Sequence, residues 1–237
     1  MIMNINIMTL FPNMFSNFIE ESIVGRAVKN KIISFSLYDI RDYSDDIHKH
    51  VDDEIYGGGP GMLMKVKPVY DCYMDVISKI PKDNKQKTIF LTPRGKTFDN
   101  DVAKDLATYD TLNFICAHYE GVDERAIELI NPELISIGDY VLTGGEIPAM
   151  VIIDSTIRFI KGVLNNEESA SDESFNNSLL ECPQYTRPEE FMGLKVPEVL
   201  RSGDHKKIKE YRLSESIEIT KKYRPDLYKK YKEATNE

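Results

Sequence analysis

One stretch of the chain combines residue types that suit close contact with a small molecule. Residues 136–150 read SIGDYVLTGGEIPAM, in which an apolar run meets a glycine and a second run ends in a double glycine, an acid and a proline. Glycine lets a backbone approach another group closely, so the pattern predicts a loop wrapped around a ligand. Phosphate is the first ligand to consider, because glycine-rich turns before helices often bind it.

Phosphate does not suit the residues that follow these glycines. A P-loop needs a Lys and then a Ser or Thr after its last glycine, whereas Glu146 follows Gly145 here. A carboxylate in that position predicts repulsion of a triphosphate, and no GxGxxG follows a predicted strand, so a Rossmann dinucleotide site is not indicated either. An acidic, glycine-lined pocket suits a neutral or cationic ligand such as S-adenosylmethionine, which carries a sulfonium.

Two other loops share the position of this one, directly after a predicted strand. They are residues 91–95 (LTPRG) and 117–125 (AHYEGVDER). In an open α/β sheet, ligands bind beyond the carboxyl ends of parallel strands, so the three loops predict one pocket. The alternative is three ordinary turns, but turns of about two to six residues seldom need a double glycine and a further glycine.

A second glycine-rich segment lies in a long polar loop. Residues 57–61 read GGGPG and predict either close approach to a partner or a mobile loop. His48 and His50 precede Asp52 and Asp53, which resembles a set of metal ligands. A third well-spaced nitrogen ligand is missing from this segment, so we interpret the two as loop histidines that titrate.

The elements that must position these loops alternate between strands and helices. Strands are expected over residues 3–7, 34–38, 88–91, 112–116 and 134–137, and helices over residues 13–29, 69–80, 99–109, 123–130 and 148–163. This alternation predicts an α/β domain with a mainly parallel sheet, and the short, unbroken apolar strands support it.

The pattern changes near residue 164. Residues 165–178 read NNEESASDESFNNS, with four acids and no base, which predicts a polar linker. Further on, Ser202 is expected to cap a basic helical region and Pro225 to open a last helix. The expected organisation is an α/β domain, a flexible acidic linker and a small C-terminal helical domain, at residues 1–163, 164–178 and 179–237.

Composition sets the class of protein. Of the 237 residues, 41% are hydrophobic and 29% charged, as in a soluble globular protein. No signal segment opens the sequence, and no apolar run approaches the ~20 residues of a membrane span, so no membrane partner is expected. Cys72, Cys116 and Cys182 are far apart and form no CxxC pair, which argues against a disulfide framework or a zinc site and fits a reducing cytoplasm.

Charge is uneven along the chain. The formal net charge is −9, but residues 195–232 hold twelve Lys/Arg and six Asp/Glu, a net of +6, which leaves −15 elsewhere. Such asymmetry indicates either an end that meets an anionic partner or a solvated helical tail.

Several stretches together resemble a known family, the bacterial tRNA (guanine-N1)-methyltransferases of the SPOUT methyltransferase class. The matching stretches are residues 56–62, 91–93, 119–125, 136–150, 182–188 and 196–205. The resemblance implies methyl transfer from S-adenosylmethionine to N1 of the guanosine 3′-adjacent to a tRNA anticodon. It also implies a deep trefoil knot and a homodimer with the active site between subunits, although unknotted topologies are the general rule.

The resemblance also implies roles for individual residues. The cofactor-binding residues would be Leu91, Thr92, Pro93, Tyr119, Glu120, Gly121, Ser136, Ile137, Gly138, Tyr140, Leu142, Gly144, Gly145 and Pro148. The RNA-binding residues would be Asp53, Gly58, Gly59, Arg187, Ser202, His205, Lys206 and Lys207. The glycines at 138, 144 and 145 would let the backbone close around the cofactor.

The catalytic residues implied are three acids, two of them alternatives for one role, and an arginine. Guanine N1 carries a proton at neutral pH, so a general base must remove it as the methyl group is attacked. The family places an aspartate before a Ser-Phe pair, where this chain has Glu173, with Asp172 beside it as the alternative base. Arg158 would stabilise negative charge that develops on O6. Glu124 would lie near the target base, where Mg²⁺ is also implied, with Glu124 and Glu173 as ligands.

Departures from the family pattern leave other readings open. Ile55, Ala117, His118, Gln184 and Asp204 stand where the family usually has other residues. A methyltransferase acting on another RNA site, an RNA-binding protein without catalysis, and a phosphate hydrolase are the alternatives. Ordering the linker costs about 1–2 kcal/mol per residue, so we expect it to be disordered until tRNA binds.

Overall fold

The computed structural model describes residues 2–164, 174–175 and 177–235. It divides into two compact units, residues 1–165 and 166–237. The expected base, Glu173, and the alternative, Asp172, lie outside the described residues together with most of the predicted linker. Among the described helices, none has the length and apolar character needed to cross a membrane.

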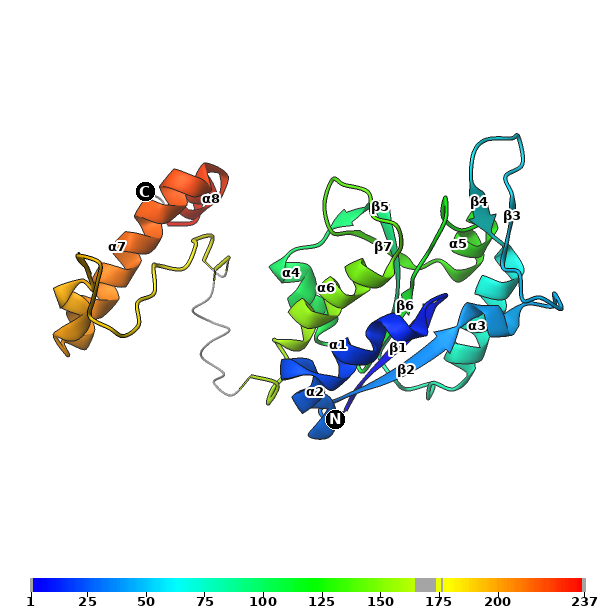
Figure 1. The fold of residues 1–237 in the computed structure, drawn as a ribbon, viewed down its shortest axis with the longest axis horizontal. Helices are drawn as coiled ribbons and strands as arrows, with labels where there is room; N and C mark the ends of the chain where they lie inside the picture. Colours follow the sequence, from blue (N-terminus) through cyan, green and yellow to red (C-terminus); the bar gives the residue numbers. More distant parts are fainter. Residues whose placement is uncertain (1, 165–173, 176, 236–237) are drawn as a thin grey trace. The chain divides into compact units, whose positions relative to one another are not determined.

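The first unit is built on a five-stranded parallel sheet with strand order β2-β1-β6-β5-β7 (Figure 1). The strands are β1 (Met3–Thr9), β2 (Ile33–Asp39), β5 (Gln86–Thr97), β6 (Thr111–Ile115) and β7 (Glu133–Ser136). Their side chains pack into two hydrophobic cores, one on each face of the sheet. Burial on both faces explains the apolar stretches within β5 and β7, and the predicted α/β fold with a mainly parallel sheet is confirmed.

Helices cover both faces of this sheet. One core lies under η1 (Pro12–Phe15), α1 (Ser16–Glu20), α2 (Ser22–Lys29), α4 (Asn100–Leu106) and α6 (Glu146–Ile157). The other lies under η2 (Ile40–Tyr43), α3 (Val66–Ser78) and α5 (Glu124–Ile130). A small antiparallel ribbon, β3 (Asp52–Glu54) and β4 (Met62–Met64), interrupts the long loop in which no strand was expected.

The single helix expected over residues 13–29 is wrong, because the chain breaks into η1, α1 and α2. Ser22 lies in the left-handed region, with φ of 55°. Gly25 packs so closely on the preceding turn that a Cβ there would lie 2.1 Å from the carbonyl oxygen of Glu20. This close packing reorients the chain between α1 and α2.

Helix α6 begins at Glu146, two residues before Pro148, and ends at Ile157 instead of near residue 163. Pro148 is therefore its third residue and not its first. The position tolerates proline because the first four N–H groups of a helix have no intrahelical acceptor.

The second unit is mainly helical. Its elements are β8 (Glu190–Phe191), β9 (Leu194–Lys195), η4 (Glu198–Arg201), α7 (His205–Tyr223) and α8 (Pro225–Thr235). The cap of α7 is Asp204, whose side chain accepts from the Lys207 N–H, so the expectation that Ser202 caps this helix is wrong. Ser202 instead follows η4 and donates its hydroxyl proton to the Val199 carbonyl.

Candidate functional site

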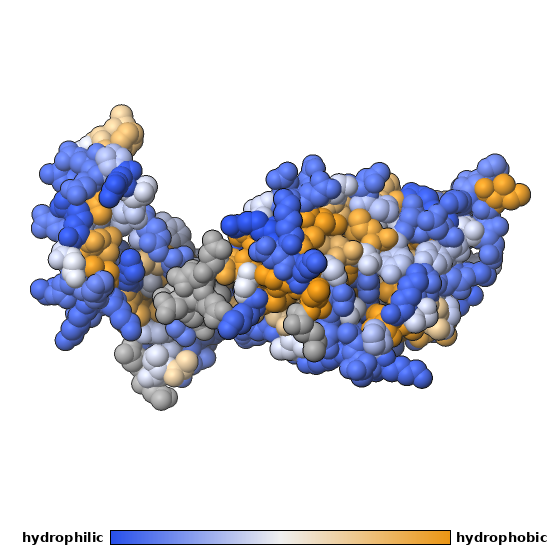
Figure 2. Space-filling model, turned by 90° about the horizontal axis from the view of Figure 1, so that it is seen from below, coloured by the Kyte–Doolittle hydropathy of each residue, from blue (hydrophilic) through white to orange (hydrophobic). Residues whose placement is uncertain are grey.

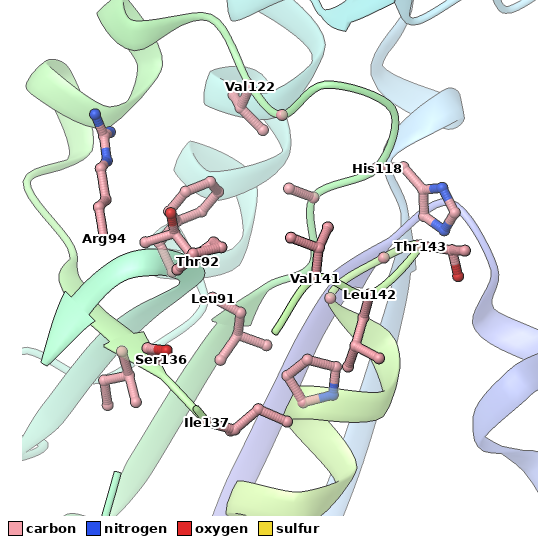
Figure 3. Close-up of a pocket in the computed structure, with 18 of the residues that line it drawn as sticks. Leu91, Thr92, Arg94, His118, Val122, Ser136, Ile137, Val141, Leu142 and Thr143 are labelled. Atoms are coloured by element: carbon pink, nitrogen blue, oxygen red, sulfur yellow. The ribbon is translucent and has the colours of Figure 1, made fainter. Parts of the chain in front are cut away.

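A pocket of about 420 Å³ opens beyond the carboxyl ends of β5, β6 and β7 (Figure 3). Its lining comes from three segments, residues 90–94, 117–124 and 135–148. The prediction that three strand-end loops meet at one pocket is therefore confirmed. Pockets that bind small molecules usually measure about 300–1,000 Å³, so a cosubstrate fits by size.

A break in β5 brings its residues into this pocket. Leu91 and Lys96 both pair with Ile135 of β7, so the residues between them leave the ladder. A Cβ at Gly95 would lie 2.4 Å from the Ile135 nitrogen, and glycine therefore allows the chain to return to the sheet. The bulge carries residues 92–94 out over the strand ends.

The loop after β6 is held by the β4 strand. The Glu120 N–H donates to the Met62 carbonyl and the Met64 N–H to the Gly121 carbonyl, each at 3.0 Å. Tyr119, which precedes these two residues, has a left-handed backbone, with φ of 57°. Burial raises the pKa of its hydroxyl. These contacts fix the loop before any ligand is present.

Every residue predicted to bind the cofactor lies in the lining of this pocket. They are Leu91, Thr92, Pro93, Tyr119, Glu120, Gly121, Ser136, Ile137, Gly138, Tyr140, Leu142, Gly144, Gly145 and Pro148. Apolar side chains form one part of the wall, and Thr92 and Ser136 add hydroxyl groups to it (Figure 3). The sequence prediction left out Arg94 and His118, which stand at opposite ends of the pocket in the same view.

Gly138 shapes the loop after β7. Its φ is 144°, and a Cβ there would lie 2.6 Å from a ring carbon of Tyr140. The Tyr140 hydroxyl reaches back to donate to the Ile137 carbonyl at 3.3 Å. A larger residue at position 138 would displace the ring, so this glycine serves the wall of the pocket directly.

Gly144 and Gly145 line the pocket and also lie close to other parts of the protein. A Cβ at Gly144 would lie 2.3 Å from His118 Nε2, and one at Gly145 would lie 2.7 Å from the Cys116 Cα. The space beside both glycines is therefore filled by the protein itself. They allow the loop to pack on the end of β6, and the Gly145 N–H donates to the Ala117 carbonyl at 2.9 Å.

Glu146 is also placed differently from the sequence interpretation. Its side chain is 1% exposed, and it does not line the pocket. One carboxylate oxygen accepts from the Thr9 hydroxyl at 2.6 Å, and the other lies 3.4 Å from His118 Nε2. The argument that this acid repels a phosphate is therefore wrong, because Glu120 and Glu124 are the acids that line the pocket.

The two described catalytic candidates lie in different places. Glu124 lines the pocket at the start of α5, and its carboxylate accepts from Arg94 Nη2 at 2.9 and 2.7 Å. Arg158 directly follows α6 and is not part of the lining. At 1.5 Å per residue, it lies roughly 15 Å along the helix axis from Pro148.

The described side chains do not form a metal site. No group of three or more His, Cys, Asp or Glu side chains among them is arranged to hold an ion. Of the two expected Mg²⁺ ligands, Glu124 is paired with Arg94, and Glu173 lies outside the described residues. His50 pairs with Asp46, with 3.2 Å between Nδ1 and Oδ1.

The predicted RNA-binding residues are solvent-exposed. Those in the first unit lie on β3 and on the loop between β3 and β4. Those in the second unit lie next to Pro188, just before α7, or in the first turn of α7. They are Asp53, Gly58, Gly59, Arg187, Ser202, His205, Lys206 and Lys207. A Cβ at Gly58 or Gly59 would meet no atom within 4 Å, so that loop extends into solvent.

Comparison with known proteins identifies the family of this chain. Residues 3–230 match the family model described as tRNA (Guanine-1)-methyltransferase TrmD. The chain belongs to this methyltransferase family. The resemblance seen in the sequence is thereby confirmed, and the chain is an enzyme of the methyltransferase class.

Curated relatives agree with the family assignment over at least 93% of their length. The chain is 55% identical over 229 residues to a tRNA (guanine-N(1)-)-methyltransferase of Lachnospira eligens, covering 97% of this chain and 96% of the relative. It is 54% identical over 231 residues to the Clostridioides difficile enzyme of the same name, covering 98% and 100%. A Clostridium botulinum relative of that name is 54% identical, with 97% and 93% covered.

Proposed function

We propose that the chain transfers a methyl group from S-adenosylmethionine to N1 of the guanosine 3′-adjacent to the anticodon of tRNA. The observation that carries this proposal is the pocket at the carboxyl edge of the sheet, lined by every residue that the family resemblance assigns to the cofactor. Membership of the tRNA (guanine-1)-methyltransferase family supports the reaction and the tRNA substrate.

The lining suits S-adenosylmethionine chemically. Leu91, Ile137, Leu142 and Pro148 offer an apolar surface of the kind that a purine ring needs. Glu120 supplies negative charge for a cationic ligand. When bound, S-adenosylmethionine supplies a methyl group already activated by its sulfonium.

Proton removal is the main chemical task of the protein in this reaction. In the proposed step the guanine N1–CH₃ bond forms as the S–CH₃ bond breaks, and the sulfur keeps the electron pair. The Glu173 carboxylate, or that of Asp172, accepts the N1 proton. Arg158 stabilises the negative charge that develops on O6. Among the described residues no three potential metal ligands lie together, and the proposed step uses only side chains of the protein.

Arg158 follows α6 and does not line the pocket of its own chain. A homodimer explains how it reaches a pocket. We propose that the arginine of one copy completes the pocket of the other. The exposed side of α6 and the adjoining η1 support this, because Met14, Ile147 and Val151 are each 44–49% exposed and apolar. Figure 2 shows hydrophobic side chains gathered on one face of the first unit. Exposed apolar patches of this kind mark interaction sites.

Two further assignments belong to the same proposal. The trefoil knot implied by the family is supported by the return of the loop after β7 to the end of β6, where Gly144 bridges His118. The second unit is proposed to bind tRNA phosphates, supported by the net charge of +6 over residues 195–232 and the exposed lysines of α7.

Mapping of the product tests the proposed function. A tRNA transcript with guanosine after the anticodon is incubated with enzyme and S-adenosylmethionine, and the modified position is located by primer extension. A stop at that guanosine alone supports the proposal. A stop elsewhere, or 2′-O-methylation without a stop, would assign the enzyme another RNA site.

A further inference from the structure

Glu146 is a buried acid that the proposed reaction does not use. Among the residues that the structure describes, Glu146 is the one charged residue whose side chain is buried, with 1% of its surface exposed. A carboxylate removed from water must be hydrogen-bonded and paired with opposite charge, or its burial is unfavourable. Its surroundings therefore show what the protein gains by keeping it.

Both carboxylate oxygens of Glu146 have partners from other segments of the fold. The Thr9 hydroxyl at the end of β1 donates to Oε1 at 2.6 Å, and the same hydroxyl accepts from the Phe11 N–H at 2.9 Å. Oε2 lies 3.4 Å from Nε2 of His118, in the loop after β6. Glu146 thus joins the start of α6 to two strand ends.

His118 connects this buried contact to the pocket. Its side chain is 20% exposed, and it lines the pocket near Thr143 and Leu142 (Figure 3). Its ring lies 4.7 Å from the ring of Phe11, which limits how far it can move away from Glu146. The position of this ring therefore depends on an acid that the pocket does not expose.

The loop after β7 is built around the same pair. Gly144 forms an isolated antiparallel β-bridge with His118. A Cβ at position 144 would lie 2.5 Å from Glu146 Oε2. The glycine therefore leaves the space that the imidazole and the carboxylate occupy. Two walls of the pocket, residues 117–121 and 138–145, meet at this contact.

We propose that Glu146 is a positioning residue for S-adenosylmethionine binding, which acts by fixing the His118 ring between the two loops that form the pocket. The inference rests on the proposed function, because it takes S-adenosylmethionine as the occupant. It assigns no step of the chemistry to Glu146, which contacts neither substrate. A binding site is weakened when the residues around its binding groups do not hold those groups in place, even if the groups shift only slightly.

The Glu146→Gln variant tests this role. Glutamine keeps the size of the side chain and an acceptor for the Thr9 hydroxyl, but it removes the charge that faces His118. We expect the Kd and the KM for S-adenosylmethionine to rise on the order of tenfold, while kcat at saturation and the KM for tRNA stay unchanged. Isothermal titration calorimetry gives the Kd, and steady-state kinetics give the other constants.

Two comparisons make the result specific. Glu128→Gln, on an exposed acid of α5, is the matched control and should leave all constants unchanged. The His118→Ala variant should weaken S-adenosylmethionine binding to a similar degree, and the double variant should be no weaker than either single one, because both remove the same contact. His118→Ala also provides the test if Glu146→Gln does not fold.

The outcomes separate this inference from the proposed function. If the wild-type protein does not bind S-adenosylmethionine, the proposed function fails and the inference fails with it. If the wild type binds but Glu146→Gln binds equally well, or if the two substitutions weaken binding additively, the positioning role alone is overturned. A rise in the KM for tRNA by the same factor also contradicts it, since that result indicates general loss of structure.

Discussion

The two compact units of this methyltransferase bury very different amounts of side chain. The first unit has a hydrophobic core on each face of its sheet, and its pocket loops are held by contacts such as Glu146 with His118. In the second unit the buried residues among those described are Leu179, Cys182, Thr220 and Leu227. A small-molecule site needs loops fixed in advance, whereas an exposed basic surface suits a large anionic partner. The difference therefore predicts that substitutions in the two units affect different substrates.

The largest effect is expected at the proposed base. Glu173→Ala should lower kcat by roughly 10²- to 10⁴-fold, because general-base catalysis contributes that much. Asp172→Ala should have a much smaller effect. Single-turnover methylation at saturating tRNA measures both. Equal rates for Glu173→Ala and wild type would show that the base is another residue.

The next effect tests whether the pocket needs a second copy. Arg158→Ala should lower kcat by about 10²- to 10³-fold, as loss of a group that stabilises developing charge does. Gly145→Val should inactivate the pocket of its own copy. Equal amounts of the two variants are mixed after partial denaturation, so that half of the dimers contain one copy of each. Each mixed dimer has one intact site out of two, so the mixture should regain about a quarter of wild-type activity. No recovery, despite mixed dimers seen by native mass spectrometry, argues against a shared site.

A moderate effect is expected from a smaller change at the same glycine. A Cβ at Gly145 would lie 2.7 Å from the Cys116 Cα, so Gly145→Ala must displace backbone. Overpacking costs about 1–3 kcal/mol. When this cost is taken from the free energy of binding, the Kd for S-adenosylmethionine rises roughly 5- to 150-fold. The Kd for tRNA should stay the same. Asp139→Asn, in the same loop but exposed and outside the pocket lining, is the control and should alter the Kd by less than about twofold.

The smallest effect is expected in the second unit. Changing Lys206 and Lys207 to Glu should weaken tRNA binding and reduce the slope of log K against log salt by about 1–2, because each phosphate contact contributes about 0.7–0.9. S-adenosylmethionine binding should be unaffected. The exposed Lys82→Glu change in the first unit serves as the control. A salt slope equal to that of wild type would remove these lysines from the RNA surface.

Much of the fold was predictable because its signals are local. Residues 3–7 were recognised as a strand from their alternation with a period of two. Residues 88–91 were recognised as a short run of the kind that a buried parallel strand forms. The three strand-end loops could then be assigned to one pocket from topology alone. The family resemblance supplied the identities of the lining residues, which composition and periodicity do not reveal.

The features that sequence reasoning missed depend on contacts between distant segments. The break before α2 follows from the packing of Gly25 on the Glu20 carbonyl, which no helical period records. Glu146 was taken for an acid that faces a ligand, since a charged residue after a glycine loop is usually exposed. Its burial depends on Thr9 and His118, which are 137 and 28 positions away in the sequence.

Single-turnover methylation of three anticodon stem-loops tests the central claim most directly. They carry guanosine, inosine or adenosine after the anticodon, with enzyme in excess and labelled S-adenosylmethionine. The account predicts transfer to the guanosine stem-loop, with the product identified by mass spectrometry as N1-methylguanosine. The adenosine stem-loop should give no product, since an amino group replaces the O6 on which Arg158 would stabilise negative charge, and inosine measures the part played by the 2-amino group. Equal transfer to guanosine and adenosine would contradict the account, because it would show that methyl transfer depends neither on O6 nor on removal of a proton from N1.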